Sequence, residues 1–166
     1  MPLVPFDSLP DDARLWIFGA RAALDDVDSA RLLGAVDLFL KSWTAHGAPL
    51  TCARDFRDEH FLLVAVDERA SDASGCSIDG LFRILKEAEG GIGTSLVGGG
   101  LVYFRGPEGL VLSCTRREFE HMSAMGEVNG ETPVFDTTLT TMADFRARFE
   151  RSARESWHAE LLQARK

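Results

Sequence analysis

A continuous run of six apolar residues, Phe61-Leu62-Leu63-Val64-Ala65-Val66, constrains the fold more than any other feature of the sequence. The run has no polar face and ends at Asp67-Glu68. Such a pattern is typical of a strand that is covered on both sides. The sequence therefore predicts a central strand inside a layered domain.

Two amphipathic helices flank this run. Apolar residues at spacings of three and four predict a helix over 25–46, with Asp25 as its N-cap and Gly47 as its C-terminal stop. The second helix is predicted to end near Gly90-Gly91. Its apolar face consists of Ile78, Leu81, Phe82 and Leu85.

Shorter segments predict the other elements. The Gly106–Gly109 turn joins two strands into a hairpin, Thr115 and Glu118 form a capping box, and Thr141 caps a last helix. Residues 1–12 are expected to be an extended lead-in. Strands are predicted at 14–18, 50–57, 101–104, 110–112 and 134–135.

The order of these elements predicts an α+β fold built as a two-layer sandwich. The first six elements match the ferredoxin-like βαββαβ plan, followed by a C-terminal hairpin partner and helices. No linker breaks the chain, so residues 1–166 are expected to form a single domain.

Composition narrows the function classes. The net charge of −8 argues against a nucleic-acid partner, because non-specific affinity for nucleic acid depends on a basic surface. Residues 144–166 carry six basic against four acidic residues, which is read as a solvated helix face. No apolar stretch is long enough to insert into a membrane. Three cysteines without an export signal indicate free thiols and a cytoplasmic location.

The segment Ser74-Gly75-Cys76-Ser77 is the strongest candidate site, because it leads from a buried strand into a helix. Amide groups at a helix start attract anions, including a thiolate, and would lower the pKa of Cys76. In the alternative interpretation, Ser74 or Ser77 caps the helix and Cys76 fills a small gap in the core.

Helical geometry places Cys76 opposite the apolar face, with Arg83 almost beneath it and Asp79 beside it. Arg83 would favour a thiolate and Asp79 would oppose it. The candidate catalytic residues are therefore Cys76 and Asp79, and the candidate ligand-binding residues are Ser74, Gly75, Ser77 and Arg83.

Two histidines complete this candidate site. His46 ends the first predicted helix, where the helix dipole is a sufficient structural reason for it, and His158 follows Trp157 near the C-terminus. Either could act as a general base if it lay within reach of Cys76. No pair of residues has the spacing of a metal site, so neither a metal nor a cofactor is predicted.

The glycine-rich stretch 91–100 does not fit a nucleotide site. It lacks the lysine of a P-loop, and Gly98-Gly99-Gly100 precedes a strand rather than joining a strand to a helix. It is predicted to be a mobile connection.

Five further segments are considered together: Trp43-Thr44-Ala45-His46-Gly47, Phe61 to Asp67, Ser74-Gly75-Cys76-Ser77-Ile78-Asp79, Val134-Phe135-Asp136 and Ser156-Trp157-His158. These segments resemble an uncharacterised bacterial family, some members of which carry the label "ABC transporter ATPase". The resemblance covers nearly the whole chain and implies a bacterial, intracellular, stand-alone domain. This sequence lacks the phosphate-binding loop that the label demands.

Three hypotheses for the function follow. The first is thiol-based acyl or amide chemistry at Cys76, which would make the chain an enzyme. The second is a non-catalytic module that binds a small anionic ligand at the same helix start, with loop 91–100 closing over it. The third is a protein-interaction subunit or homo-oligomer that uses an apolar patch of Trp16, Phe18 and Trp157.

Overall fold

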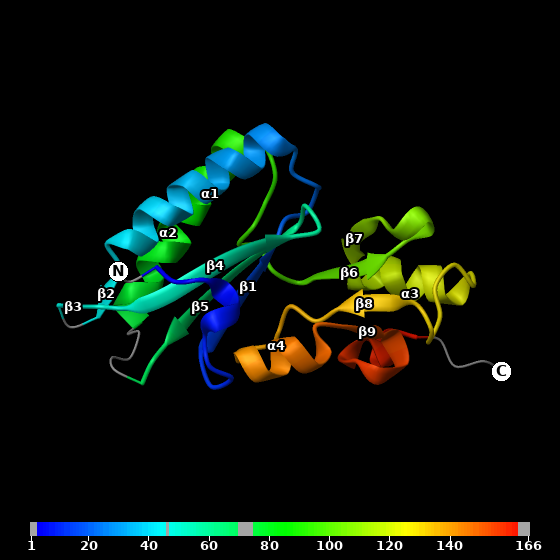
Figure 1. The fold of residues 1–166 in the computed structure, drawn as a ribbon. Helices are drawn as coiled ribbons and strands as arrows, with labels where there is room; N and C mark the ends of the chain where they lie inside the picture. Colours follow the sequence, from blue (N-terminus) through cyan, green and yellow to red (C-terminus); the bar gives the residue numbers. More distant parts are fainter. Residues whose placement is uncertain (1–2, 46, 70–74, 163–166) are drawn as a thin grey trace.

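The computed structural model describes residues 3–45, 47–69 and 75–162, with the backbone alone at 45 and 75–77. Strands β1 (Arg14–Gly19), β5 (Phe61–Asp67) and β4 (Thr51–Arg57) form an antiparallel sheet in the order β1-β5-β4 (Figure 1). Strand β5 is central and all six of its apolar residues are buried, as the sequence predicts.

Helices α1 (Asp26–Lys41) and α2 (Gly75–Ile92) cover one face of this sheet (Figure 1). The Asp25 carboxylate accepts a hydrogen bond from the Asp28 amide at 2.8 Å, which confirms the predicted N-cap. The prediction that α1 continues to residue 46 is wrong. The chain instead turns at Gly47 (φ 80°) between strands β2 (Thr44–Ala45) and β3 (Ala48–Pro49), so this glycine serves a hairpin.

A second antiparallel sheet has the order β7-β6-β8-β9. Its strands are β6 (Leu101–Arg105), β7 (Val111–Thr115), β8 (Pro133–Phe135) and β9 (Glu150–Ser152). The predicted hairpin joins β6 to β7 through a short 3-10 turn, η2 (Pro107–Gly109). Helix α3 (Arg116–Ala124) follows β7, and both halves of the Thr115–Glu118 capping box are present. Two further 3-10 turns, η3 (Ala153–Glu155) and η4 (Trp157–Leu161), end the described chain.

The α+β prediction is confirmed, but the ferredoxin-like plan is wrong for its fourth strand. In that plan the strand at 101–105 would join the first sheet, whereas β6 pairs with β7 and β8. Part of the outer edge of β1 is taken by the segment after β8, because the Leu15 amide donates to the Thr140 carbonyl at 2.8 Å. The first sheet therefore keeps three strands.

The last helix, α4 (Met142–Arg148), begins at the predicted cap, where Thr141 Oγ1 accepts from the Asp144 amide at 3.2 Å. It is short, because the chain enters β9 at Glu150. The expectation of a solvated helix face over 144–166 is therefore wrong beyond Arg148.

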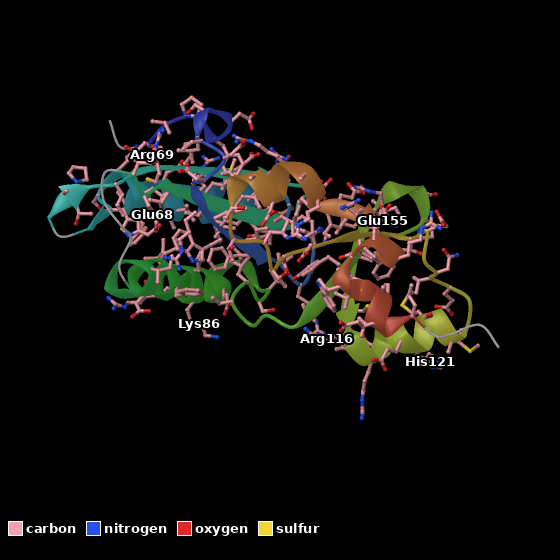
Figure 2. All side chains as sticks on the ribbon, turned by 90° about the horizontal axis from the view of Figure 1, so that it is seen from below. Glu68, Arg69, Lys86, Arg116, His121 and Glu155 are labelled. Atoms are coloured by element: carbon pink, nitrogen blue, oxygen red, sulfur yellow. The ribbon has the colours of Figure 1, made fainter. Side chains whose placement is uncertain are left out.

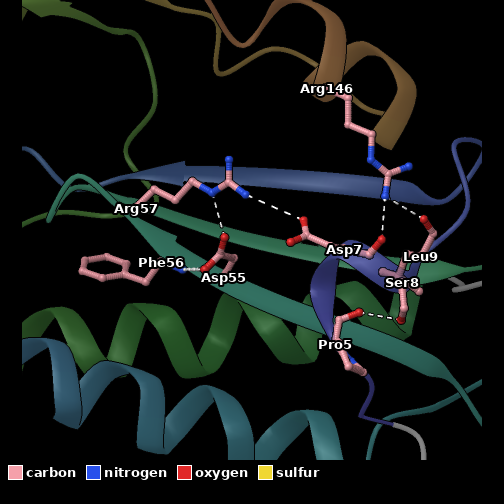
Figure 3. Close-up of polar contacts among 8 residues, drawn as sticks. All are labelled: Pro5, Asp7, Ser8, Leu9, Asp55, Phe56, Arg57 and Arg146. Atoms are coloured by element: carbon pink, nitrogen blue, oxygen red, sulfur yellow. Dashed lines mark hydrogen bonds and ion pairs between the residues drawn. The ribbon is translucent and has the colours of Figure 1, made fainter.

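The N-terminal segment is held against the first sheet and α4. It contains a 3-10 turn, η1 (Phe6–Ser8), and is not extended throughout as expected. Arg146 donates to the carbonyl oxygens of Leu9 at 2.8 Å and Asp7 at 3.2 Å (Figure 3). Arg57 donates to Asp55 at 2.7 Å and lies 4.0 Å from the Asp7 carboxylate.

The molecule has two layers: the first contains the sheet β1-β5-β4 with α1 and α2, and the second contains the sheet β7-β6-β8-β9 with α3. A shared core joins them. Phe61 of β5 packs against Phe135 of β8 and Phe149, with ring centroids 4.9 and 5.2 Å apart. The Tyr103 hydroxyl donates to the Gly19 carbonyl at 2.7 Å, and its ring lies so close that a Cβ at residue 19 would meet it at 2.4 Å. The layers therefore pack as one body. Within the described part of the chain, no helix could cross a bilayer.

Candidate functional site

The predicted site near Cys76 is defined only by its backbone. Helix α2 begins at Gly75, so positions 75–77 form its first turn, as the thiolate hypothesis requires. Ser74 and His46 lie outside the described residues. Asp79 and Arg83 are exposed on the outer face of α2, opposite the buried Leu81 and Leu85, as predicted.

The structure does not bring His158 to this helix start. His158 lies in η4 and packs on Trp157 and Phe119, whereas α2 packs in the core of the first layer. Figures 1 and 2 show η4, in the red part of the chain, in the other layer and far from the start of α2. A Cys76–His158 pair within hydrogen-bond reach is therefore not formed.

The glycine-rich stretch 91–100 cannot close over the start of α2. It follows the other end of an 18-residue helix, and at about 1.5 Å per residue the two ends are about 27 Å apart. The expected apolar patch of Trp16, Phe18 and Trp157 is also wrong. Phe18 is buried in the first layer, and Trp157 packs in the second.

The described residues instead form a polar cavity of about 470 Å³ on the second layer, which we call the arginine cavity. Arg116 comes from the first turn of α3, Arg148 from the end of α4 and Arg151 from β9. Trp157 of η4 also lines it. Figure 2 shows Arg116 and Glu155 on this layer, away from Lys86 of α2.

Arg116 and Trp157 are the least satisfied polar groups of the arginine cavity. The Arg116 guanidinium lies over the Trp157 ring, 4.8 Å from its centroid, and pairs with no carboxylate among the described residues. The Trp157 Nε1–H is buried and has no acceptor in the described part of the chain. A buried donor without a partner costs about 1–3 kcal/mol, so an acceptor that reached this indole would stabilise the protein.

The other charges of the arginine cavity are largely engaged. Arg148 lies 3.5 Å from Asp144, and Arg151 lies 3.5 Å from Glu155. The Asp136 carboxylate accepts from the backbone amide and the hydroxyl of Thr138, at 2.9 and 2.5 Å. Glu160 also lines the cavity and forms no ion pair with the described residues, and Arg116 is the one of the three arginines without a carboxylate partner among them.

His158 packs against Trp157, one of the residues that line the arginine cavity. It is fully buried, stacks on the Trp157 ring at 3.9 Å, and its Nδ1 lies 2.8 Å from Ser156 Oγ. Its Nε2 has no partner among the described residues. Burial lowers the pKa of His158 to about 4; Asp136 opposes this lowering and Arg116 adds to it. His158 is therefore a neutral ring that holds Trp157 in place.

Sequence reasoning missed the arginine cavity. Arg116 follows the capping threonine directly, and Trp157 and His158 are neighbours in the sequence, but the residues that line the cavity are spread from position 116 to 160. Only the fold of the second sheet brings them together.

The comparisons with known proteins add no relative. No family model matches the chain, and neither curated proteins nor solved structures contain a significant match. Within residues 3–45, 47–69 and 75–162, no three histidine, cysteine or acidic side chains cluster in a way that could hold a metal ion.

Proposed function

We propose that this chain is a non-catalytic binding module that takes a small anion in the arginine cavity. The observation that carries the proposal is the unpartnered Trp157 Nε1–H beside an arginine without a carboxylate partner. An anionic oxygen would accept from both groups, and hydrogen bonds of this charge-assisted kind are about twice as strong as neutral ones.

The acidic residues of the arginine cavity restrict the ligand. Asp136, Glu155 and Glu160 line the cavity with the three arginines, so the formal net charge of its lining is zero. A polyanion such as nucleic acid would meet these carboxylates and the overall charge of −8. The cavity therefore favours a ligand with one compact anionic group.

Calorimetric titration with inorganic phosphate and acetate tests the proposal. We expect saturable binding of at least one anion, lost in Arg116→Gln and kept in Arg117→Gln. Arg117 is the matched control, because it is the next residue of α3, is exposed and forms no ion pair with the described residues. Equal binding by the two variants would contradict the assignment to Arg116.

A second candidate function is thiol-based acyl or amide chemistry at Cys76. One observation favours it: α2 begins at Gly75, so residue 76 stands in the first turn of an 18-residue helix. Amides there would stabilise a thiolate, and no role for His158 is needed. The small-anion hypothesis at this helix start shares the same support.

The alkylation rate of each cysteine against pH tests this second candidate. An unperturbed thiol titrates near about 8.5, so a thiolate site predicts a midpoint well below that value for Cys76. If Cys76 reacts only after unfolding, the thiol chemistry is excluded and Cys76 is a core residue.

A further inference from the structure

A second hollow of about 270 Å³ adjoins the arginine cavity, and we call it the apolar cavity. It lies between β1, the loop before β6 and the segment after β8. It is smaller than the arginine cavity, and a larger share of its lining surface is apolar. Its walls include Trp16, Phe18, Phe82, Leu96, Val97 and Tyr103.

The apolar cavity opens where two paired segments separate. Arg14 bridges Thr141, and the Leu15 amide donates to the Thr140 carbonyl. The same register would next place Ile17 opposite Thr138. Thr138 instead turns away, because its amide and hydroxyl both bond to Asp136, and the cavity fills the gap.

This separation leaves the backbone of Ile17 without a partner. Alternate residues of an edge strand point their N–H and C=O groups outward, so Ile17 points the same way as Leu15 and Gly19. Leu15 bonds to Thr140, and the Gly19 carbonyl accepts from Tyr103. Ile17, which lines the cavity, has no outward hydrogen bond to the described residues. One donor and one acceptor therefore face a mainly apolar space, whose lining also includes Thr137, Thr138 and Thr140.

Thr138 lines both cavities, so they lie next to each other at this residue. Together they offer three features: a free arginine with an indole N–H, a main-chain donor and acceptor, and an apolar wall. A purely aliphatic ligand would leave the Ile17 groups desolvated and unpaired. A ligand with an amide would satisfy them.

We propose, on the basis of the anion-binding function above, that the ligand is an acylated amino acid or peptide terminus with a free carboxylate and an apolar side chain. Its carboxylate binds Arg116 and Trp157 in the arginine cavity. Its amide pairs with Ile17, and its apolar side chain enters the apolar cavity.

Four small probes separate these contributions. N-acetylleucine carries all three features, N-acetylglycine lacks the side chain, N-acetylleucinamide lacks the carboxylate and 4-methylpentanoate lacks the amide. Titration of the full chain should give the tightest binding for N-acetylleucine. We expect losses of about tenfold or more without the side chain or the carboxylate, and of about two- to tenfold without the amide.

A cavity-filling variant localises the side-chain contribution. Val97 lines the apolar cavity and not the arginine cavity, so Val97→Phe should abolish the advantage of N-acetylleucine over N-acetylglycine. It should leave phosphate and acetate binding unchanged. A melting temperature close to that of the unmodified protein would show that the variant folds.

The outcomes distinguish the two proposals. If phosphate or acetate binds through Arg116 but the three probes that carry a carboxylate bind equally, the ligand class proposed here is wrong and the anion site stands. If N-acetylleucine, phosphate and acetate all fail to bind, both proposals are wrong. If a longer peptide ending in leucine binds much more tightly than N-acetylleucine, the ligand is a peptide terminus and not a free acylated amino acid.

Discussion

His158 makes the stability of the folded protein depend on pH. A histidine in the unfolded chain titrates near about 6.5, whereas burial lowers the pKa of folded His158 to about 4. Between these values the unfolded state binds the proton and the folded state does not. We therefore expect the free energy of unfolding to fall as the pH drops from about 7 to about 4, by up to about 3 kcal/mol.

Denaturant titrations across this pH range check the prediction. His158→Phe removes this part of the pH dependence, while His121→Phe keeps it, because His121 is exposed on α3. A slope that is the same in the unmodified protein and in His158→Phe would show that His158 does not titrate differently in the two states.

The two buried thiols should be unreactive in the folded protein. Burial raises the pKa of Cys52 and of Cys114 to about 11, with the Glu118 carboxylate contributing at Cys114. Both are free and buried. We expect iodoacetamide at pH 8 to label neither residue within the time that labels both in denaturant, as peptide masses would reveal. Rapid labelling of Cys52 in the folded state would contradict this account.

At the scale of single elements, Gly34 weakens α1 without a structural need. It is exposed in the middle of the helix, and a Cβ there would meet nothing within 4 Å. Alanine is a better helix former than glycine by about 0.8–1.0 kcal/mol. Gly34→Ala should therefore raise the free energy of unfolding by about that amount, measured by denaturant titration. A destabilised variant would mean that α1 is distorted at this point.

The elements could be predicted from sequence where their signals are local. Caps at Asp25, Thr115 and Thr141 are hydrogen bonds within three residues, and each is found where the pattern places it. The end of α1 was missed, because Gly47 suits both a helix stop and a hairpin turn, and nothing nearby distinguishes the two uses.

At the scale of the whole molecule, Gly19 allows the two layers to pack. A Cβ at this position would meet the Tyr103 ring at 2.4 Å, and Tyr103 is buried and cannot move aside freely. Gly19→Ala should destabilise the protein by about 1–3 kcal/mol, as overpacking does. Thermal unfolding followed through both layers would show one transition at a lower temperature. An unchanged melting temperature would show that the layers adjust without cost.

The arrangement of the two layers was the part that sequence could not supply. The run 61–66 predicts a strand covered on both sides, but not that Phe135 and Phe149 cover one of them. The arginine cavity has the same origin, since Arg116, Arg148 and Trp157 belong to three elements with no common motif. The second sheet sets the positions of these residues, and the pairing of its strands depends on contacts between residues that are distant in the sequence.

The indole N–H signal of Trp157 tests the central claim most directly. The chain has three tryptophans, so a proton–nitrogen correlation NMR spectrum contains three indole N–H signals. Of the three, only Trp157 lines the arginine cavity. Titration with phosphate or acetate should move the Trp157 signal to saturation, leave those of Trp16 and Trp43 in place, and have no effect in Arg116→Gln. If neither anion moves the Trp157 signal, or if all three signals drift together without saturation, the anion site does not exist.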